Sequence, residues 1–171
     1  MDTLRLLIRR FRPDDWSELY EYLSQEETVK YEPYDVITEP MSKQEALRRS
    51  KSESFWAVCL KSTGKLIGNI YMSEQAYHTW ELGYVFNSKY LGQGYATEAA
   101  RAMINYMFAQ GAHRITAECN PLNERSWKLL ERLGMSREGV LRQNVFFSTD
   151  ERGEPVWQDT YVYAMLRSEW K

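Results

Sequence analysis

The sequence has few residues that could hold a metal ion or a disulfide framework. It contains two cysteines, Cys59 and Cys119, and two histidines, His78 and His113. The cysteines lie in separate apolar runs without CxxC spacing, and no cluster has the ligand spacing of a zinc site. We therefore expect two buried free thiols, a reducing compartment and no metal.

Long apolar runs and a strong net charge are also missing. No stretch approaches the ~20 apolar residues of a membrane span, and residues 1–11 interleave arginines with apolar residues, unlike the core of a signal peptide. A formal net charge of −2 gives no basic field for a phosphate backbone. These absences predict a cytoplasmic protein without a membrane or nucleic-acid partner. A length of 171 residues is typical of a single domain, 1–171.

The hydrophobic pattern predicts a mixed α/β (α+β) fold. A helix between strands 79–87 and 113–119 makes that pair a parallel crossover, whereas short links make the preceding strands antiparallel neighbours. We expect a mostly antiparallel sheet of about seven strands flanked by helices. The expected strands are 3–11, 54–61, 66–75, 79–87, 113–119, 137–147 and 156–166, and the expected helices are 13–24, 42–52, 94–110 and 123–133.

The segment between the first two helices is the least regular part of the pattern. Residues 25–41 are polar and aromatic, and Pro33 and Pro40 are breakers, so we expect an irregular segment with at most one short helix. Ser42 followed by Glu45 is typical of a capping box. This pattern predicts that the second helix begins at Ser42.

The most informative stretch is a glycine-containing turn between a strand end and a helix start. It reads Leu-Gly-Gln-Gly-Tyr-Ala-Thr-Glu-Ala over residues 91–99. Glycines let the backbone come close to an anion, and the free N–H groups of a first helical turn point at it with the helix dipole behind them. The turn is therefore suited to phosphate oxygens, although a glycine pair alone can simply close a turn.

A dinucleotide-binding fold is the main competitor for this turn. Gly92-x-Gly94 after a strand, with Glu118 at the end of the next strand, resembles its fingerprint. However, Thr97 occupies the third glycine position, and several antiparallel strands precede the unit. Too little sequence follows to build a second nucleotide-binding half. We therefore disfavour this fold.

The turn resembles motif A of the GNAT acyltransferases. That motif, Gln/Arg-x-x-Gly-x-Gly/Ala, maps onto Leu91, Gly94 and Ala96, and Leu91 stands where the family usually has Gln or Arg. Two further stretches are similar to the branch of the family that contains the ribosomal-protein alanine and serine N-acetyltransferases. They are the flanking residues 95–99 and the sequence Asn-x-x-Ser at 123–126, which is followed by Leu-Glu-x-Leu-Gly-Met at 130–135. The resemblance covers nearly the whole chain and implies the GNAT fold, with its parallel crossover at the cofactor site.

The resemblance also implies how a cofactor would be held. Acetyl-CoA would be the donor, with pantetheine paired along the backbone of residues 84–86 and hydrogen-bonded by Asn123. The amides from Gly92 to Thr97 would hold the pyrophosphate. The expected cofactor-binding residues are Tyr84, Val85, Phe86, Leu91, Gly92, Gln93, Gly94, Tyr95, Ala96, Thr97, Asn123 and Ser126.

Transfer to an amine needs a neutral nucleophile, a polarised carbonyl and a stabilised thiolate. Ser126 resembles the family serine that donates to the leaving sulfur, and a backbone N–H near Val85 is the expected oxyanion donor. Glu81 and Glu118 are the candidate bases, the latter because it matches a catalytic glutamate of a related protein N-acetyltransferase. Ser126 could instead be an ordinary exposed helical serine. Each glutamate could hold only a water molecule or form a strand-edge salt bridge, and Glu118 could equally face solvent.

The nature of the acceptor is only weakly indicated. Without an obvious strong base, a protein N-terminal α-amine suits the site better than a lysine. A polyamine or aminoglycoside, or a non-catalytic CoA-binding module, is the alternative, and the chain could be a monomer or a homodimer. Some aromatic and acidic residues could line an acceptor cleft, but are left unassigned: Tyr31, Tyr34, Trp56, Tyr77, Phe146, Phe147, Glu26, Glu27, Glu32 and Asp35.

Overall fold

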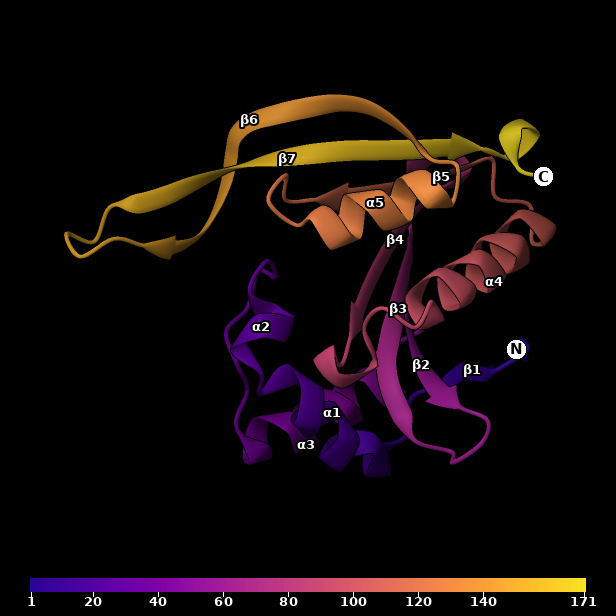
Figure 1. Cartoon of the computed structure of the whole chain (residues 1–171), viewed down its shortest axis with the longest axis horizontal. Coiled ribbons are helices and arrows are strands. Elements are labelled where there is room, and N and C mark those ends of the chain that lie inside the picture. The colour runs from indigo at the N-terminus through magenta and orange to yellow at the C-terminus, as the bar shows by residue number, and fades with distance from the viewer.

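The computed structural model describes residues 1–171 and contains one seven-stranded sheet (Figure 1). The strand order is β1-β2-β3-β4-β5-β7-β6. All neighbours are antiparallel except β4 and β5, so the predicted mixed sheet with one parallel crossover is confirmed. The strands are β1 (Leu6–Arg10), β2 (Phe55–Leu60), β3 (Leu66–Glu74), β4 (Thr79–Phe86), β5 (Arg114–Cys119), β6 (Ser136–Thr149) and β7 (Pro155–Leu166).

Helices cover both faces of the sheet (Figure 1). Helices α1 (Trp16–Leu23), α2 (Glu26–Val29) and α3 (Glu39–Ser50) lie on one side, and α4 (Tyr95–Ala109) and α5 (Glu124–Arg132) lie on the other. Side chains alternate across a strand, so neighbouring residues join different cores. Val58 and Phe86 pack with α4 and α5, whereas Ala57 and Val85 pack with the N-terminal helices. None of the helices combines the length and apolar character needed to cross a lipid bilayer.

The parallel pair separates soon after it forms. Residues Thr79–Glu81 of β4 pair with Arg114–Thr116 of β5, and no pairing continues from Leu82 onward. The rest of β4 keeps its antiparallel partner β3 on the other edge. A gap therefore opens between β4 and β5 at their C-terminal ends, where backbone groups of β4 have no strand partner.

The start of the third helix differs from the expectation. Helix α3 begins at Glu39 after Thr38, so Pro40 lies in its first turn, where a proline is tolerated. Ser42 lies inside the helix, and its hydroxyl donates to the carbonyl of Glu39. Glu45 instead pairs with arginines of the following turn. The predicted capping box is wrong because proline opened the helix one turn earlier.

The last two strands form a long hairpin that extends well beyond the other strands (Figure 1). Its register shifts three times between Arg137 and Thr149, which bends and twists the pair. The hairpin residues Val145, Phe147, Gln158 and Asp159 reach the cavity described below. The hairpin therefore contributes one wall of the candidate site.

Candidate functional site

The glycine turn presents a row of free backbone donors at the start of α4. Gly92 and Gly94 have φ of +75° and +81°, a left-handed conformation that favours glycine. The amide N–H groups from Gly92 to Thr97 donate no hydrogen bond within the chain. Six successive free donors at the positive end of a 15-residue helix fit phosphate oxygens.

Two arginines that the local sequence did not indicate hold this turn in place. Arg5 donates to the Gln93 carbonyl at 2.9 Å and pairs with Glu98 at 2.7 Å. Arg132 of α5 donates to the Thr97 hydroxyl at 3.1 Å. Both come from distant parts of the chain, which is why the motif did not reveal them. They place positive charge near a turn that has Leu91 where the family has Gln or Arg.

A groove of about 370 Å³ runs from this turn to the gap between β4 and β5. One wall comes from β4 and the start of α4, and the other from α5. Tyr31 and Glu27 reach across to α5, where Tyr31 donates to the Leu122 carbonyl and Glu27 pairs with Arg125 at 3.0 Å. The groove brings together several of the predicted cofactor-binding residues: Tyr84, Phe86, Leu91, Ala96, Asn123 and Ser126.

The edge of β4 that faces β5 borders this groove. The Gln75 N–H donates to Thr79 and the Asn87 N–H to Ile67, so odd-numbered β4 residues turn their N–H groups toward β3. The N–H groups of Tyr84 and Phe86, beyond the last β4–β5 bridge, therefore face the gap. The N–H of Val85 itself points toward β3, so the free donors near it are those of Tyr84 and Phe86.

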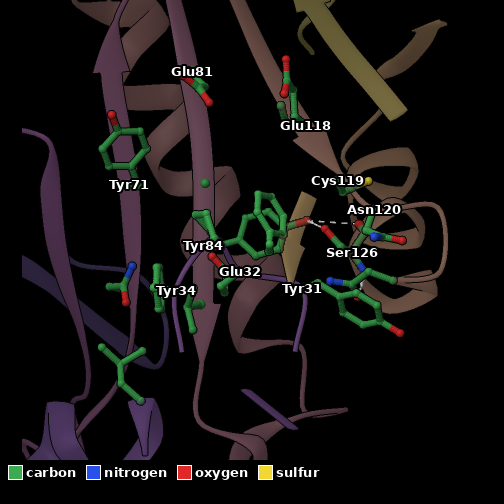
Figure 2. Close-up of a pocket in the computed structure, with 18 of the residues that line it drawn as sticks. Tyr31, Glu32, Tyr34, Tyr71, Glu81, Tyr84, Glu118, Cys119, Asn120 and Ser126 are labelled. Atoms are coloured by element: carbon green, nitrogen blue, oxygen red, sulfur yellow. Dashed lines mark hydrogen bonds between the residues drawn. The ribbon is translucent and has the colours of Figure 1, made fainter. Parts of the chain in front are cut away.

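Ser126 and Tyr84 form a hydroxyl pair at the inner end of the groove (Figure 2). Their oxygens are 2.9 Å apart, and the Tyr84 hydroxyl also donates to the Ser126 carbonyl at 3.1 Å. Asn123 caps α5 by accepting from the Ser126 N–H. Burial raises the pKa of Tyr84, so its hydroxyl stays protonated. Ser126 is half-buried and bonded, so it is not the exposed helical serine of the alternative interpretation.

Cys119 lies beside this pair at the end of β5 (Figure 2). Burial raises the pKa of its thiol to about 11, which outweighs the lowering effect of a hydrogen bond with Ser126. A thiol must ionise to act as a nucleophile. Cys119 is therefore protonated at neutral pH and unsuited to forming an acyl-enzyme. Cys59 is also a buried free thiol, as predicted.

A second, larger cavity of about 800 Å³ meets the groove at the gap. It lies over the sheet face that carries Glu81, Gly83 and Val85, and residues 31–37, α3 and the β6–β7 hairpin surround it. Its aromatic lining includes Tyr31, Tyr34 and Phe147, together with Phe55 and Tyr71, which the sequence did not single out. Trp56, Tyr77, Phe146, Glu26, Glu27 and Asp35 do not line it.

Glu81 and Glu118 face this cavity from neighbouring strands (Figure 2). Burial, and then the negative charge of Glu118, raise the pKa of Glu81. Gln75 donates to the Glu81 carboxylate at 3.2 Å. Neither glutamate forms an ion pair, so the strand-edge salt bridge is wrong for both. The two carboxylates are thus unpaired at the cavity, where Glu81 is half-buried and Glu118 is exposed to solvent.

Glu32 is a third carboxylate of the cavity (Figure 2). Burial raises its pKa to about 7, although the Tyr34 hydroxyl and the charge of Arg49 oppose the shift. Its sequence context of polar and aromatic residues gave no reason to prefer it over its acidic neighbours. Only the folded loop shows that this one carboxylate turns inward.

Comparisons with known proteins identify the family and the fold of the chain. An acetyltransferase (GNAT) domain model matches residues 5–136. The chain is 39% identical to the Bacillus subtilis N-acetyltransferase YnaD over 98% of this chain and 97% of that one. It is 34% identical to the Escherichia coli [ribosomal protein uS5]-alanine N-acetyltransferase over 56% of this chain and 46% of that one. The crystal structure of a GNAT acetyltransferase from Bacillus anthracis matches with a TM-score of 0.90, 36% identity and 99% coverage of both chains. The chain therefore belongs to the GNAT family and is an N-acetyltransferase.

Proposed function

We propose that this enzyme transfers acetyl from acetyl-CoA to the α-amine of a peptide or protein N-terminus by direct attack. The observation that carries the proposal is the junction at the gap, where Tyr84, Asn123 and Ser126 line both the groove and the larger cavity, which also holds the unpaired Glu81. A donor in the groove and an amine in the cavity would meet there from opposite sides of the sheet. The relative that acts on the alanine of ribosomal protein uS5 supports an N-terminal acceptor.

The chain's own residues fit the donor from end to end. Free amides of the turn would hold the pyrophosphate, and the open β4 edge at Tyr84 and Phe86 would pair with pantetheine. Asn123 uses its oxygen to cap α5, which leaves its amide N–H groups for the same arm. The Ser126 hydroxyl would turn its one proton to the sulfur, which leaves as the thiolate of CoA, while the Tyr84 hydroxyl donates to the Ser126 oxygen.

The base at the site suits an α-amine better than a lysine. An α-amine with a pKa near 8 is ~10% neutral at pH 7, whereas neutralising a lysine near 10.4 costs ~4.6 kcal/mol. Burial and the charge of Glu118 raise the pKa of Glu81, but its carboxylate is still a weak base compared with a lysine amine. It can take a proton from an amine that is already partly neutral, directly or through a water molecule.

A small cationic amine is the second candidate, because the cavity is acidic. Arg48 and Arg49 both form their ion pairs with Glu45, so the other carboxylates of the cavity have no ion-pair partner. Aromatic walls add a favourable surface for a cation. The carboxylates without an ion pair are Glu32, Glu81, Glu118 and Asp159.

A panel of acceptors distinguishes the two candidates. The enzyme would be given acetyl-CoA with an alanine-initiated peptide, the same peptide with a blocked N-terminus and an internal lysine, and spermidine. We expect kcat/KM for the free α-amine to exceed the other two by at least about tenfold, with the acetyl group located by mass spectrometry. A preference for spermidine would support the second candidate. Tight CoA binding without turnover of any amine would instead support a non-catalytic module.

Glu81→Gln tests the base. Since burial and Glu118 raise the Glu81 pKa, the active carboxylate form gains population as pH rises, and kcat/KM should rise with it. We expect the substitution to lower kcat/KM about 10- to 100-fold and to remove this rise, which forms the acidic limb of the pH profile. Glu118→Gln is the matched control and should move the limb to lower pH, because it removes a negative neighbour. An unchanged pH profile in Glu81→Gln would exclude Glu81 as the base.

Cys119→Ala tests direct attack. A protonated, buried thiol takes no acetyl group, so the variant should keep at least about a third of wild-type turnover. Intact-mass spectra of the wild-type enzyme with acetyl-CoA alone should show no added acetyl group. Loss of turnover together with an acetylated Cys119 in the wild type would indicate a covalent intermediate instead.

A further inference from the structure

We infer that Asn69 is a substrate-binding residue, whose side-chain amide donates a hydrogen bond to a backbone carbonyl oxygen near the acceptor's amine. The inference rests on the proposed function and deepens it. It requires that the acceptor carry a hydrogen-bond-accepting oxygen, as a peptide does and as spermidine does not. Asn69 lies on β3, on the floor of the large cavity.

The orientation of the Asn69 amide is fixed by two donors. Its Oδ1 accepts from the Tyr22 hydroxyl at 2.8 Å and from the Arg49 guanidinium at 2.9 Å. The flipped amide would set its own N–H groups against these donors. Oδ1 therefore faces the N-terminal helices, and Nδ2 is directed away from them.

The Nδ2 group has no acceptor within the chain. Asn69 is 2% exposed, and its only hydrogen bonds are the two that Oδ1 receives. No fully buried side-chain nitrogen or oxygen of the chain lacks a partner, so the unbonded Nδ2 atom keeps some accessible surface, which faces the cavity that Asn69 lines. Because the residue lines the cavity, an oxygen inside the cavity can supply the missing acceptor.

The position of Asn69 matches a peptide that reaches the gap. Asn69 pairs with Val85, and Tyr71 pairs with Gly83, so Asn69 shares a sheet face with Gly83 and Glu81. Diagonal neighbours across a strand pair lie about 7 to 8 Å apart. An extended peptide advances about 3.3 to 3.6 Å per residue, so its first two residues span the distance from Asn69 to Gly83, and Glu81 is the next residue of β4 on the same face. Gly83 has no side chain to block the path between Asn69 and Glu81.

The neighbouring charge also favours an oxygen at this end of the cavity. Arg49 is 3% exposed and lines the cavity beside Asn69. The carboxylates Glu81 and Glu118 lie at the other end, by the gap between β4 and β5. An acceptor with its ammonium toward the glutamates and a carbonyl toward Asn69 and Arg49 matches both ends, whereas a polyamine would place a second cation near Arg49.

Asn69→Asp tests the donor with little structural change. It keeps an oxygen for Tyr22 and Arg49 but removes both N–H donors. Two acceptors would be compared, alanyl-alaninamide and isopropylamine, which lacks the carbonyl. We expect kcat/KM for the dipeptide amide to fall at least tenfold, mainly through KM, while isopropylamine stays within twofold of wild type. Each variant is compared with wild type on the same amine, so the different amine pKa values cancel.

The matched control is Tyr22→Phe, which loses a bond to Oδ1 but leaves Nδ2 intact. Tyr22→Phe should lower the thermal midpoint of unfolding without changing the ratio of the kcat/KM values for the two amines. Asn69→Ser provides a second variant that lacks the side-chain amide. The KM for acetyl-CoA should stay unchanged throughout. Equal effects of Asn69→Asp on both amines, or none, would overturn the role of Asn69 while the proposed function stands. A wild-type enzyme that does not acetylate the dipeptide amide would contradict the proposed function itself.

Discussion

Gly94→Glu is expected to weaken CoA binding at least about 100-fold while leaving a folded protein. The new carboxylate would stand among the free amides of the turn, where it repels a pyrophosphate. Two like charges 4 Å apart near a protein surface repel by about 4 kcal/mol, enough for this loss. A Cβ at Gly94 would meet only the end of the Arg5 side chain, at 3.4 Å, so the backbone need not move far. Calorimetric titration with CoA measures the affinity.

Gly64→Glu is the matched control for this substitution. Gly64 also has a positive φ, +74°, and a Cβ there would meet nothing within 4 Å. It lies in the β2–β3 turn, away from the groove. The control therefore carries the same charge and similar backbone strain, and it should bind CoA normally. Retained affinity in Gly94→Glu would exclude the turn as the pyrophosphate site.

Ser126→Ala is expected to lower kcat about 10- to 100-fold and to change CoA affinity less than about threefold. The hydroxyl matters when charge develops on the departing sulfur, so its loss falls on the transition state rather than on binding. The removed atom makes its side-chain contact with Tyr84, and α5 remains capped by Asn123. Steady-state kinetics with CoA product inhibition separate the two effects.

Tyr84→Phe distinguishes donation by Ser126 from donation by its partner. Ser126 would keep its hydroxyl but lose the 2.9 Å contact that orients it. We expect a fall in kcat of only about three- to fivefold, which corresponds to about 0.6 to 1 kcal/mol. A larger loss in Tyr84→Phe than in Ser126→Ala would transfer the acid role to Tyr84. An unchanged kcat in Ser126→Ala would show that this serine is a bystander.

The fold was largely predictable because its strands and helices have strong local patterns. The alternation of Ile115, Ala117 and Cys119 predicted β5, and the short links predicted the antiparallel strands before it. The helix between β4 and β5 required a parallel crossover. The start of α3 was not predictable in this way. Ser42 and Glu45 have the spacing of a capping box, but the helix begins one turn earlier, at Glu39, with Pro40 in its first turn.

The site was predictable where its residues are contiguous and not where they meet across the fold. The turn at 92–97 is local, and Ser126 follows a recognisable cap. Tyr84 carried a backbone role in the prediction, but its hydroxyl reaches Ser126 across the groove. Asn69 was not singled out and Glu32 could not be separated from its acidic neighbours, since whether they line the cavity depends on which way a strand face and a loop turn. Contacts between residues 20 or more apart leave no periodicity to detect.

The central claim is that the donor groove and the acceptor cavity meet at the gap between β4 and β5. A bisubstrate analogue, in which the CoA sulfur is joined through an acetyl group to the α-nitrogen of an alanine-initiated peptide, tests it most directly by calorimetry. The account predicts that the analogue binds at least about 100-fold more tightly than CoA, and that Gly94→Glu and Asn69→Asp both weaken it. Two results would contradict a continuous path between the groove and the cavity. One is an analogue that binds no more tightly than CoA, and the other is an analogue whose affinity changes neither in Asn69→Asp nor in Glu81→Gln.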